Sequence, residues 1–107
     1  MNEVQDNKRR FIYFYFNRNE PEKIRHIVPE HVEYWKAANL HDYMGGPFAD
    51  RTGGLISFVA PSFEDAAEII QQDPFILEDL IDHKWIKEWV LETPVAELSL
   101  DNKGQKA

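Results

Sequence analysis

Six consecutive apolar or aromatic residues near the start of the chain, Phe11-Ile12-Tyr13-Phe14-Tyr15-Phe16, constrain the fold most. Aromatic and β-branched side chains favour strands, and successive side chains of a strand point to opposite faces of the sheet. This strand is therefore apolar on both faces, unlike a half-exposed strand that alternates apolar and polar residues. It needs apolar cover on both sides.

The rest of the chain predicts two main helices and three more strands. After the cap Ser62, apolar residues spaced i, i+3, i+4 and i+7 indicate a helix, and Asp65 completes a capping box. Pro29 is typical of a first helical turn and follows a polar connection that contains Pro21. In chain order, the predicted segments are a helix from Pro29 to about Leu40, an extended segment over 43–48, a turn over 49–53, a strand over 54–60, a helix from Phe63 that ends before Asp73, a short helix from Asp73-Pro74 through Leu80 and a strand over 84–92.

The order β-α-β-β-α-β predicts an α+β fold of the ferredoxin-like type, a four-stranded antiparallel sheet with two helices on one face. We expect one domain over 10–92, with a disordered N-terminal tail over 1–9 and a flexible C-terminal tail over 93–107. The other sheet face is left open, although the first strand is apolar there and the last strand adds Trp85 and Trp89. Burial of this face by a second copy predicts a homodimer.

Composition argues against several classes of function. The formal net charge of −7 disfavours contact with nucleic acids or anionic membranes. The chain contains no cysteine, which rules out disulfides, thiol nucleophiles and thiolate metal sites. His26, His41 and His83 show no metal-ligand spacing, so neither a transition metal nor another cofactor is predicted. No signal peptide or membrane span is predicted, and we expect a cytoplasmic protein.

One histidine and one aspartate, far apart in sequence, form the main candidate site. His31 borders the apolar stripe of the first predicted helix, and Asp73 directly precedes Pro74. If the fold joins them, the carboxylate can orient the imidazole and fix its tautomer, and an imidazole titrates near neutral pH, at about 6.5 in water. Each residue also has a simpler explanation, a paired core histidine and a helix N-cap. A carboxylate has two oxygens, so capping and orienting are compatible.

Three sets of motifs stand out: Pro29-Glu30-His31, Gly45-Gly46-Pro47-Phe48-Ala49-Asp50 followed by Gly53-Gly54, and Ser62-Phe63-Glu64-Asp65-Ala66 leading to Gln72-Asp73-Pro74-Phe75. Together they resemble the YCII-related family over about Arg10 to Leu91. One departure is the absence of the glycine usual between the first helix and second strand, where Asn39-Leu40-His41-Asp42 stands instead. The resemblance implies a dimeric α+β barrel in which His31 and Asp73 form a catalytic dyad, and some members are linked to lactone or dehydrohalogenation chemistry.

Five further residues are predicted to bind substrate: Tyr34, Gly45, Gly46, Phe48 and Arg51. The glycine amides could face a ligand oxyanion, and Tyr34 and Phe48 could wall a pocket. The simpler alternatives are tight backbone geometry for the glycines, core packing for the aromatic residues and a turn charge for Arg51.

Three functions compete. The leading one is a small enzyme of lyase, isomerase or dehydrohalogenase type that acts on a small carbonyl or lactone compound through His31 and Asp73. The second is a dimeric domain that binds a small metabolite without changing it. The third is an RNA-recognition motif, which shares the element order. Two observations argue against it: Leu55 and Ser57 occupy positions where the third-strand signature of that motif has an aromatic or a small packing residue, and the domain is acidic.

Overall fold

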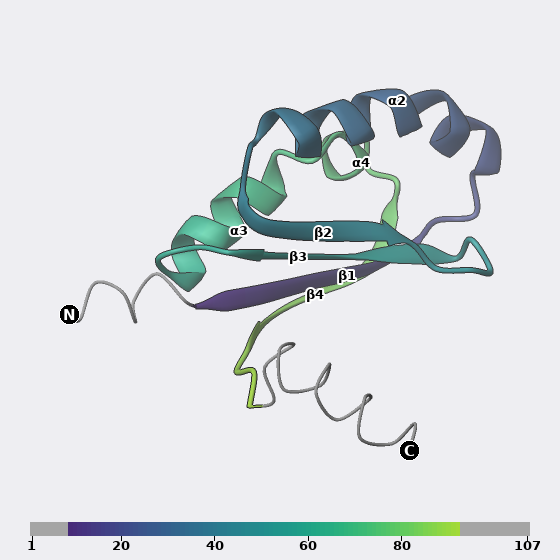
Figure 1. Cartoon of the computed structure of the whole chain (residues 1–107). Helices are drawn as coiled ribbons and strands as arrows, with labels where there is room; N and C mark the ends of the chain where they lie inside the picture. Colours follow the sequence, from purple (N-terminus) through teal and green to yellow (C-terminus); the bar gives the residue numbers. More distant parts are fainter. Residues whose placement is uncertain (1–8, 93–107) are drawn as a thin grey trace, which may run out of the picture.

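The computed structural model describes residues 9–92, so the predicted tails 1–9 and 93–107 lie outside the described residues except for Arg9. The strands in this range form one antiparallel sheet in the order β2-β3-β1-β4, and the helices lie on one side of it (Figure 1). This arrangement confirms the predicted α+β ferredoxin-like fold. The elements are β1 (Arg10–Asn17), α2 (Pro21–Ala37), β2 (His41–Pro47), β3 (Gly53–Val59), α3 (Phe63–Gln71), α4 (Pro74–Leu77) and β4 (Ile81–Trp89).

The central strand β1 pairs with β3 on one side and β4 on the other. Its residues Phe11, Tyr13 and Tyr15 are buried and point toward the helices, where Tyr13 stacks near Trp35 with ring centroids 6.4 Å apart. The alternate side chains point to the opposite face, where Phe14 stacks on Trp85 at 5.2 Å. Both faces of β1 are therefore in apolar contact.

The first helix begins at Pro21, so the predicted start at Pro29 is wrong. Pro21 occupies the first turn with Glu22 beside it, and both residue types favour a helix N-terminus. The partly buried Ile24 and Ile27 extend the apolar stripe back from His31, a signal that the prediction missed. Pro29 lies inside the helix on an exposed position, where water can bond the carbonyl that lacks its usual amide donor.

The last strand runs over Ile81–Trp89 rather than the predicted 84–92. Its start is fixed by buried Ile81, which pairs with Asn17 after a register shift in β1. Trp85 and Trp89 lie on the same face as predicted and are 42% and 49% exposed. The predicted helix through Leu80 is shorter, ending at Leu77, while the boundaries of β2 and β3 lie within two residues of the prediction.

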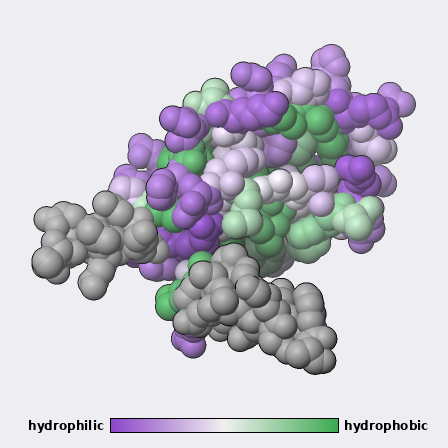
Figure 2. Space-filling view, in the orientation of Figure 1, coloured by the Kyte–Doolittle hydropathy of each residue, from purple (hydrophilic) through white to green (hydrophobic). Residues whose placement is uncertain are grey.

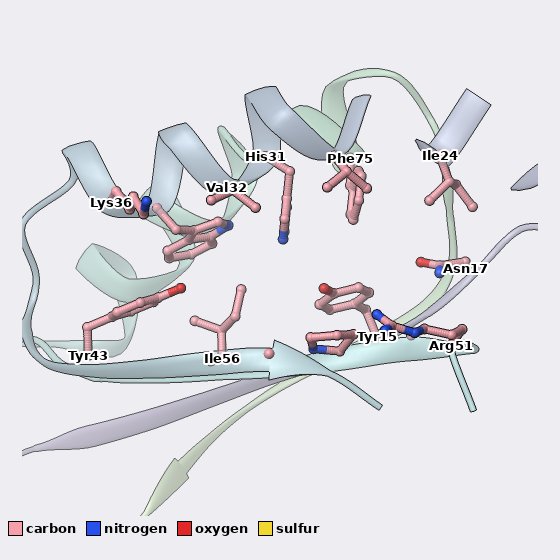
Figure 3. A pocket seen from close by; sticks show the side chains of 16 residues that line it. Tyr15, Asn17, Ile24, His31, Val32, Lys36, Tyr43, Arg51, Ile56 and Phe75 are labelled. Carbon is pink, nitrogen blue, oxygen red and sulfur yellow. The ribbon is translucent and has the colours of Figure 1, made fainter. Parts of the chain in front are cut away.

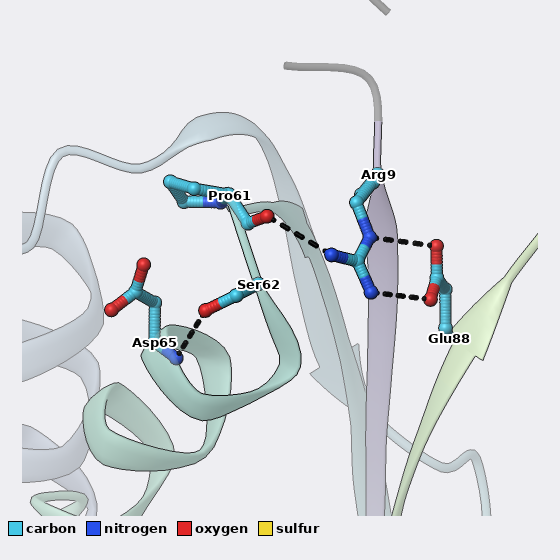
Figure 4. A network of polar contacts seen from close by, with 5 residues as sticks. All are labelled: Arg9, Pro61, Ser62, Asp65 and Glu88. Atoms are coloured by element: carbon cyan, nitrogen blue, oxygen red, sulfur yellow. Dashed lines mark hydrogen bonds and ion pairs between the residues drawn. The ribbon is translucent and has the colours of Figure 1, made fainter. Parts of the chain in front are cut away.

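Polar contacts close the end of the sheet next to α3 (Figure 4). Arg9 donates two hydrogen bonds to the carboxylate of Glu88, at 3.1 and 2.9 Å, and a third to the carbonyl of Pro61. Ser62 accepts a hydrogen bond from the Asp65 amide at 3.1 Å, which confirms the predicted cap. The outer side of α2 is coated mainly by hydrophilic residues (Figure 2), so its apolar stripe faces the sheet.

Candidate active site

The fold brings His31 and Asp73 together. The α2 helix carries His31 over the sheet, and Asp73 is the N-cap of the short helix α4, which packs against α2. The distance from His31 Nδ1 to Asp73 Oδ1 is 2.8 Å, a short hydrogen bond. The Asp73 side chain is fully buried, and that of His31 is 13% exposed.

Asp73 accepts hydrogen bonds from two further donors. Trp35 Nε1–H donates to Oδ2 at 3.0 Å, and the Phe75 amide donates to Oδ1 at 2.8 Å as the helix-capping bond. The same carboxylate therefore both caps α4 and orients the imidazole of His31. A carboxylate oxygen only accepts hydrogen bonds, so this contact needs a proton on Nδ1 of His31, and in a neutral imidazole the lone pair then lies on Nε2.

A cavity of about 450 Å³ lies between α2 and the sheet, with His31 over its centre (Figure 3). His31 Nε2 points into this space, and the ring stacks on Phe75 with centroids 4.0 Å apart and planes 10° from parallel. Tyr15 meets the imidazole edge to face at 6.2 Å. Stacking and the bond to Asp73 together hold the imidazole in one orientation.

The phenols of the cavity wall stay protonated. Burial raises the pKa of Tyr15 and of Tyr43 above the ordinary tyrosine value, and the negative charge of Asp73 raises both further. Both side chains line the cavity. A neutral phenol donates a hydrogen bond, so these hydroxyls can stabilise an oxyanion but do not act as bases at neutral pH.

A family model, the YCII-related domain, matches residues 9–90 of the chain. The chain belongs to the YCII-related family. No curated protein matches the sequence of this YCII-related protein.

Solved structures share the fold of this YCII-related protein at low sequence identity. One is the 5-chloro-2-hydroxyhydroquinone dehydrochlorinase of Burkholderia phenoliruptrix in complex with 2,5-dihydroxybenzoquinone, with a TM-score of 0.67, 18% identity, and coverage of 76% of this chain and 93% of the other. Another is SnoaB, a cofactor-independent oxygenase of Streptomyces nogalater, with a TM-score of 0.53, 8% identity, and coverage of 83% and 97%. Both share the antiparallel α+β fold of this chain.

The residues predicted to bind substrate separate into two groups in this YCII-related domain. Gly45, Gly46 and Arg51 line the same cavity as His31. Tyr34 does not line it, since its hydroxyl donates to the Ile69 carbonyl at 2.7 Å and its ring packs on Trp35. Phe48 also lies outside the lining and packs on Phe16, with centroids 5.6 Å apart.

Several lining residues were absent from the sequence prediction. Trp35 stands four positions after His31, a spacing that places both on one helix face, so the pattern could have identified it. Ile24, Val28, Val32 and Lys36 lie on the same helix, whereas the others come from strands and from the short helix α4, where no periodicity indicates a ligand. The missed lining residues are Tyr15, Asn17, Ile24, Val28, Val32, Trp35, Lys36, Tyr43, Pro47, Gly53, Ile56 and Phe75.

Within 9–92, no group of three or more histidine, cysteine, aspartate or glutamate side chains is placed to hold a metal ion. No helix in this part of the chain is both long and apolar enough to span a membrane.

Proposed function

We propose that this YCII-related protein is a small-molecule enzyme in which His31 is the acid/base group and Asp73 its positioning residue. The observation that carries the proposal is the 2.8 Å contact between His31 Nδ1 and Asp73 Oδ1, with Nε2 directed into a cavity of about 450 Å³. Such a cavity is large enough for a small organic compound. The reaction class is lyase, isomerase or dehydrohalogenase chemistry on a small carbonyl or lactone compound.

The proposed first step is removal of a proton from a carbon next to a carbonyl. His31 Nε2 takes the proton, and the electrons of the C–H bond form the double bond of an enolate, whose oxygen carries the charge. In an elimination, the carbonyl re-forms and the leaving group departs with its bonding electrons from the carbon next to the deprotonated one, and the imidazolium gives its proton to the leaving group or to water. In an isomerisation, the imidazolium returns its proton to another carbon. Positioned proton transfer of this kind contributes about 100- to 10,000-fold in rate.

The surroundings of His31 suit this step. Asp73 holds Nδ1–H and stabilises the imidazolium that forms when Nε2 takes a proton. Neutral hydroxyls of Tyr15 and Tyr43 on the cavity wall are donors for the enolate oxygen. Two structural neighbours are themselves enzymes by description, a dehydrochlorinase with a bound benzoquinone and a cofactor-independent oxygenase, which supports small-molecule chemistry on this fold.

The test measures deuterium uptake from heavy water into a panel of small ketones and lactones, followed by mass spectrometry. Wild type is compared with His31→Gln, which removes the base but keeps a donor for Asp73, and with the matched control His26→Gln, an exposed histidine on the same helix. Exchange should fall about 100-fold or more in His31→Gln and not in His26→Gln. Equal exchange in all three proteins contradicts the proposal. A ligand that binds and is recovered unchanged favours the alternative, a non-catalytic metabolite-binding domain.

We also propose that a second copy of the chain covers the open sheet face. Trp85 and Trp89 lie exposed on that face beside Phe14, an apolar surface of the kind that dimers bury. Trp85→Glu should convert a dimer into a monomer in light scattering after size exclusion. Leu77→Glu, an exposed site on α4, is the control that should leave the dimer intact. A monomeric wild type overturns this proposal. The cytoplasmic location stays a prediction.

A further inference from the structure

The charges around the cavity differ in sign from those of the whole chain. The chain carries 19 acidic and 12 basic residues. The cavity lining contains the cations Arg51 and Lys36 and no aspartate or glutamate. Asp73 lies behind the imidazole and accepts three hydrogen bonds. We propose that the cavity takes a small organic anion and that Arg51 binds its acidic group, an inference that rests on the proposed function and names its substrate class.

The backbone presents Arg51 in a conformation that does not favour a side chain. Its φ is 66°, in the left-handed region where glycine is preferred. The turn is held by Asp50 Oδ1, which accepts bonds from the Thr52 amide at 3.1 Å and from its hydroxyl at 2.7 Å, and by the Arg51 amide, which donates to the Phe48 carbonyl at 2.9 Å. The hydrogen bonds of the turn therefore hold Arg51 in a backbone conformation that favours glycine, and they fix the direction of its side chain.

The Arg51 guanidinium has no partner within the described part of the chain. None of the hydrogen bonds or ion pairs found over residues 9–92 uses its side chain, although Arg9, Arg10 and Arg18 all make such contacts. Figure 3 shows Arg51 beside Tyr15 at the floor of the cavity. A planar guanidinium offers five N–H donors and matches a carboxylate or enolate oxygen pair.

A second polar group lies at the same end. Asn17 lines the cavity next to Arg51 (Figure 3), and its Oδ1 is buried with no hydrogen-bond partner among the described residues. An amide oxygen only accepts hydrogen bonds, so this group suits an N–H or O–H of the ligand and not its acidic group. Since His31 lies over the centre of the cavity, an acidic group at the Arg51 end places the neighbouring carbon atoms of the ligand near Nε2.

Lys36 contributes differently. It is exposed in the last turn of α2, and Figure 3 shows it at the opposite end of the cavity from Arg51. A hydrated, flexible ammonium gives a weaker and less directional contact than a guanidinium held by a rigid turn. We therefore assign the preference for an anion to Arg51 and not to Lys36.

The experiment compares benzoate with benzamide by isothermal titration calorimetry, because these planar probes have nearly the same size and differ in charge. Wild type should bind benzoate about tenfold more tightly, and added salt should reduce this preference. Arg51→Gly should remove the preference without lowering the melting temperature, since the left-handed backbone favours glycine. Arg51→Lys should keep part of it. The matched control Arg25→Met removes an exposed charge outside the cavity and should keep all of it.

Three results overturn the inference: no preference for benzoate in wild type, a preference that survives in Arg51→Gly, or one that is lost in Lys36→Met instead. Because the measurement is of binding alone, it is independent of acid/base catalysis, and His31→Gln should retain the preference. If wild type shows no preference for benzoate but His31-dependent exchange is intact, only this inference fails. If wild type prefers benzoate but shows no His31-dependent exchange, only the proposed function fails.

Discussion

The carboxylate of Asp73 supports both the fold and the proposed chemistry, and Asp73→Asn separates the contributions of its charge and shape. All three partners of Asp73 are N–H donors: the imidazole of His31, the indole of Trp35 and the amide of Phe75. An asparagine of the same shape has one acceptor oxygen and one NH₂ group. It can keep the two bonds made at Oδ1, but its NH₂ group then faces the indole N–H.

The expected loss follows from these contacts. A buried donor left without an acceptor costs about 1 to 3 kcal/mol. The two retained bonds weaken by about 1 kcal/mol each, because bonds to a charged acceptor are stronger than neutral ones. Removing a buried charge also relieves its desolvation, which offsets part of the loss. We therefore expect Asp73→Asn to lower the free energy of unfolding by about 2 kcal/mol and the His31-dependent rate by about 100-fold.

Urea unfolding of Asp73→Asn, of one control variant and of a double-mutant cycle with Trp35→Phe tests this reasoning. The control Asp50→Asn changes an exposed aspartate whose bonds to Thr52 an amide oxygen can also accept, so it should change stability by less than about 0.5 kcal/mol. In a Trp35→Phe background the indole donor is gone, and Asp73→Asn should cost about 1 kcal/mol less than in wild type. The reasoning fails if Asp73→Asn is as mild as Asp50→Asn, or if the two sites show no coupling.

Three smaller perturbations test the frame around the site. Burial raises the pKa of Tyr13, so its phenol stays protonated in the fold while the unfolded chain ionises above about pH 10. The stability that Tyr13 contributes is fully present below that pH and falls by about 1.4 kcal/mol per pH unit above it, in addition to the loss from Tyr15, whose pKa burial also raises. Tyr13→Phe, which also removes a buried hydroxyl without a partner among the described residues, should make the loss less steep in alkaline urea titrations. Ser62→Ala removes the α3 cap and should cost about 1 kcal/mol by thermal unfolding, and no loss would argue against the capping bond. A Cβ at Gly53 would overlap the Tyr15 carbonyl oxygen, so Gly53→Ala should lower the free energy of unfolding by about 3 kcal/mol or more. A Cβ at Gly46 meets open space, so Gly46→Ala should lower it by less than about 0.5 kcal/mol. Equal effects of the two substitutions would contradict the close approach of β1 and β3.

Strong local patterns were enough to predict the fold class. The β1 run and the capped apolar stripe of α3 each favour one structure, and the β-α-β-β-α-β order leaves few ways to join them. The errors fell at boundaries where two signals compete. Pro21 and Pro29 both suit a first helical turn, and the choice depends on Ile24 and Ile27, whose burial is a tertiary property. The start of β4 depends on pairing with Asn17, which no local pattern reveals.

The site divides in the same way. The meeting of His31 and Asp73 could be predicted because each belongs to a family motif and each has a clear chemical role. Gly45, Gly46 and Arg51 were also predicted. Most of the cavity wall could not be, because it combines Tyr15 from a core strand, Asn17 from its end and Tyr43 from the edge strand β2. Tyr34 and Phe48 show the converse, since aromatic residues near a site in sequence can pack elsewhere.

The orientation of His31 follows from the backbone. One oxygen of Asp73 accepts hydrogen bonds from both the Phe75 amide and the His31 imidazole, so the start of α4 positions the carboxylate that holds the imidazole. Pro74 holds the backbone of that first turn, and Phe75, the next residue, stacks on the imidazole. Three consecutive residues thus set the position, the tautomer and the ring plane of one side chain on another helix. This explains how a small domain can hold an imidazole in a defined direction.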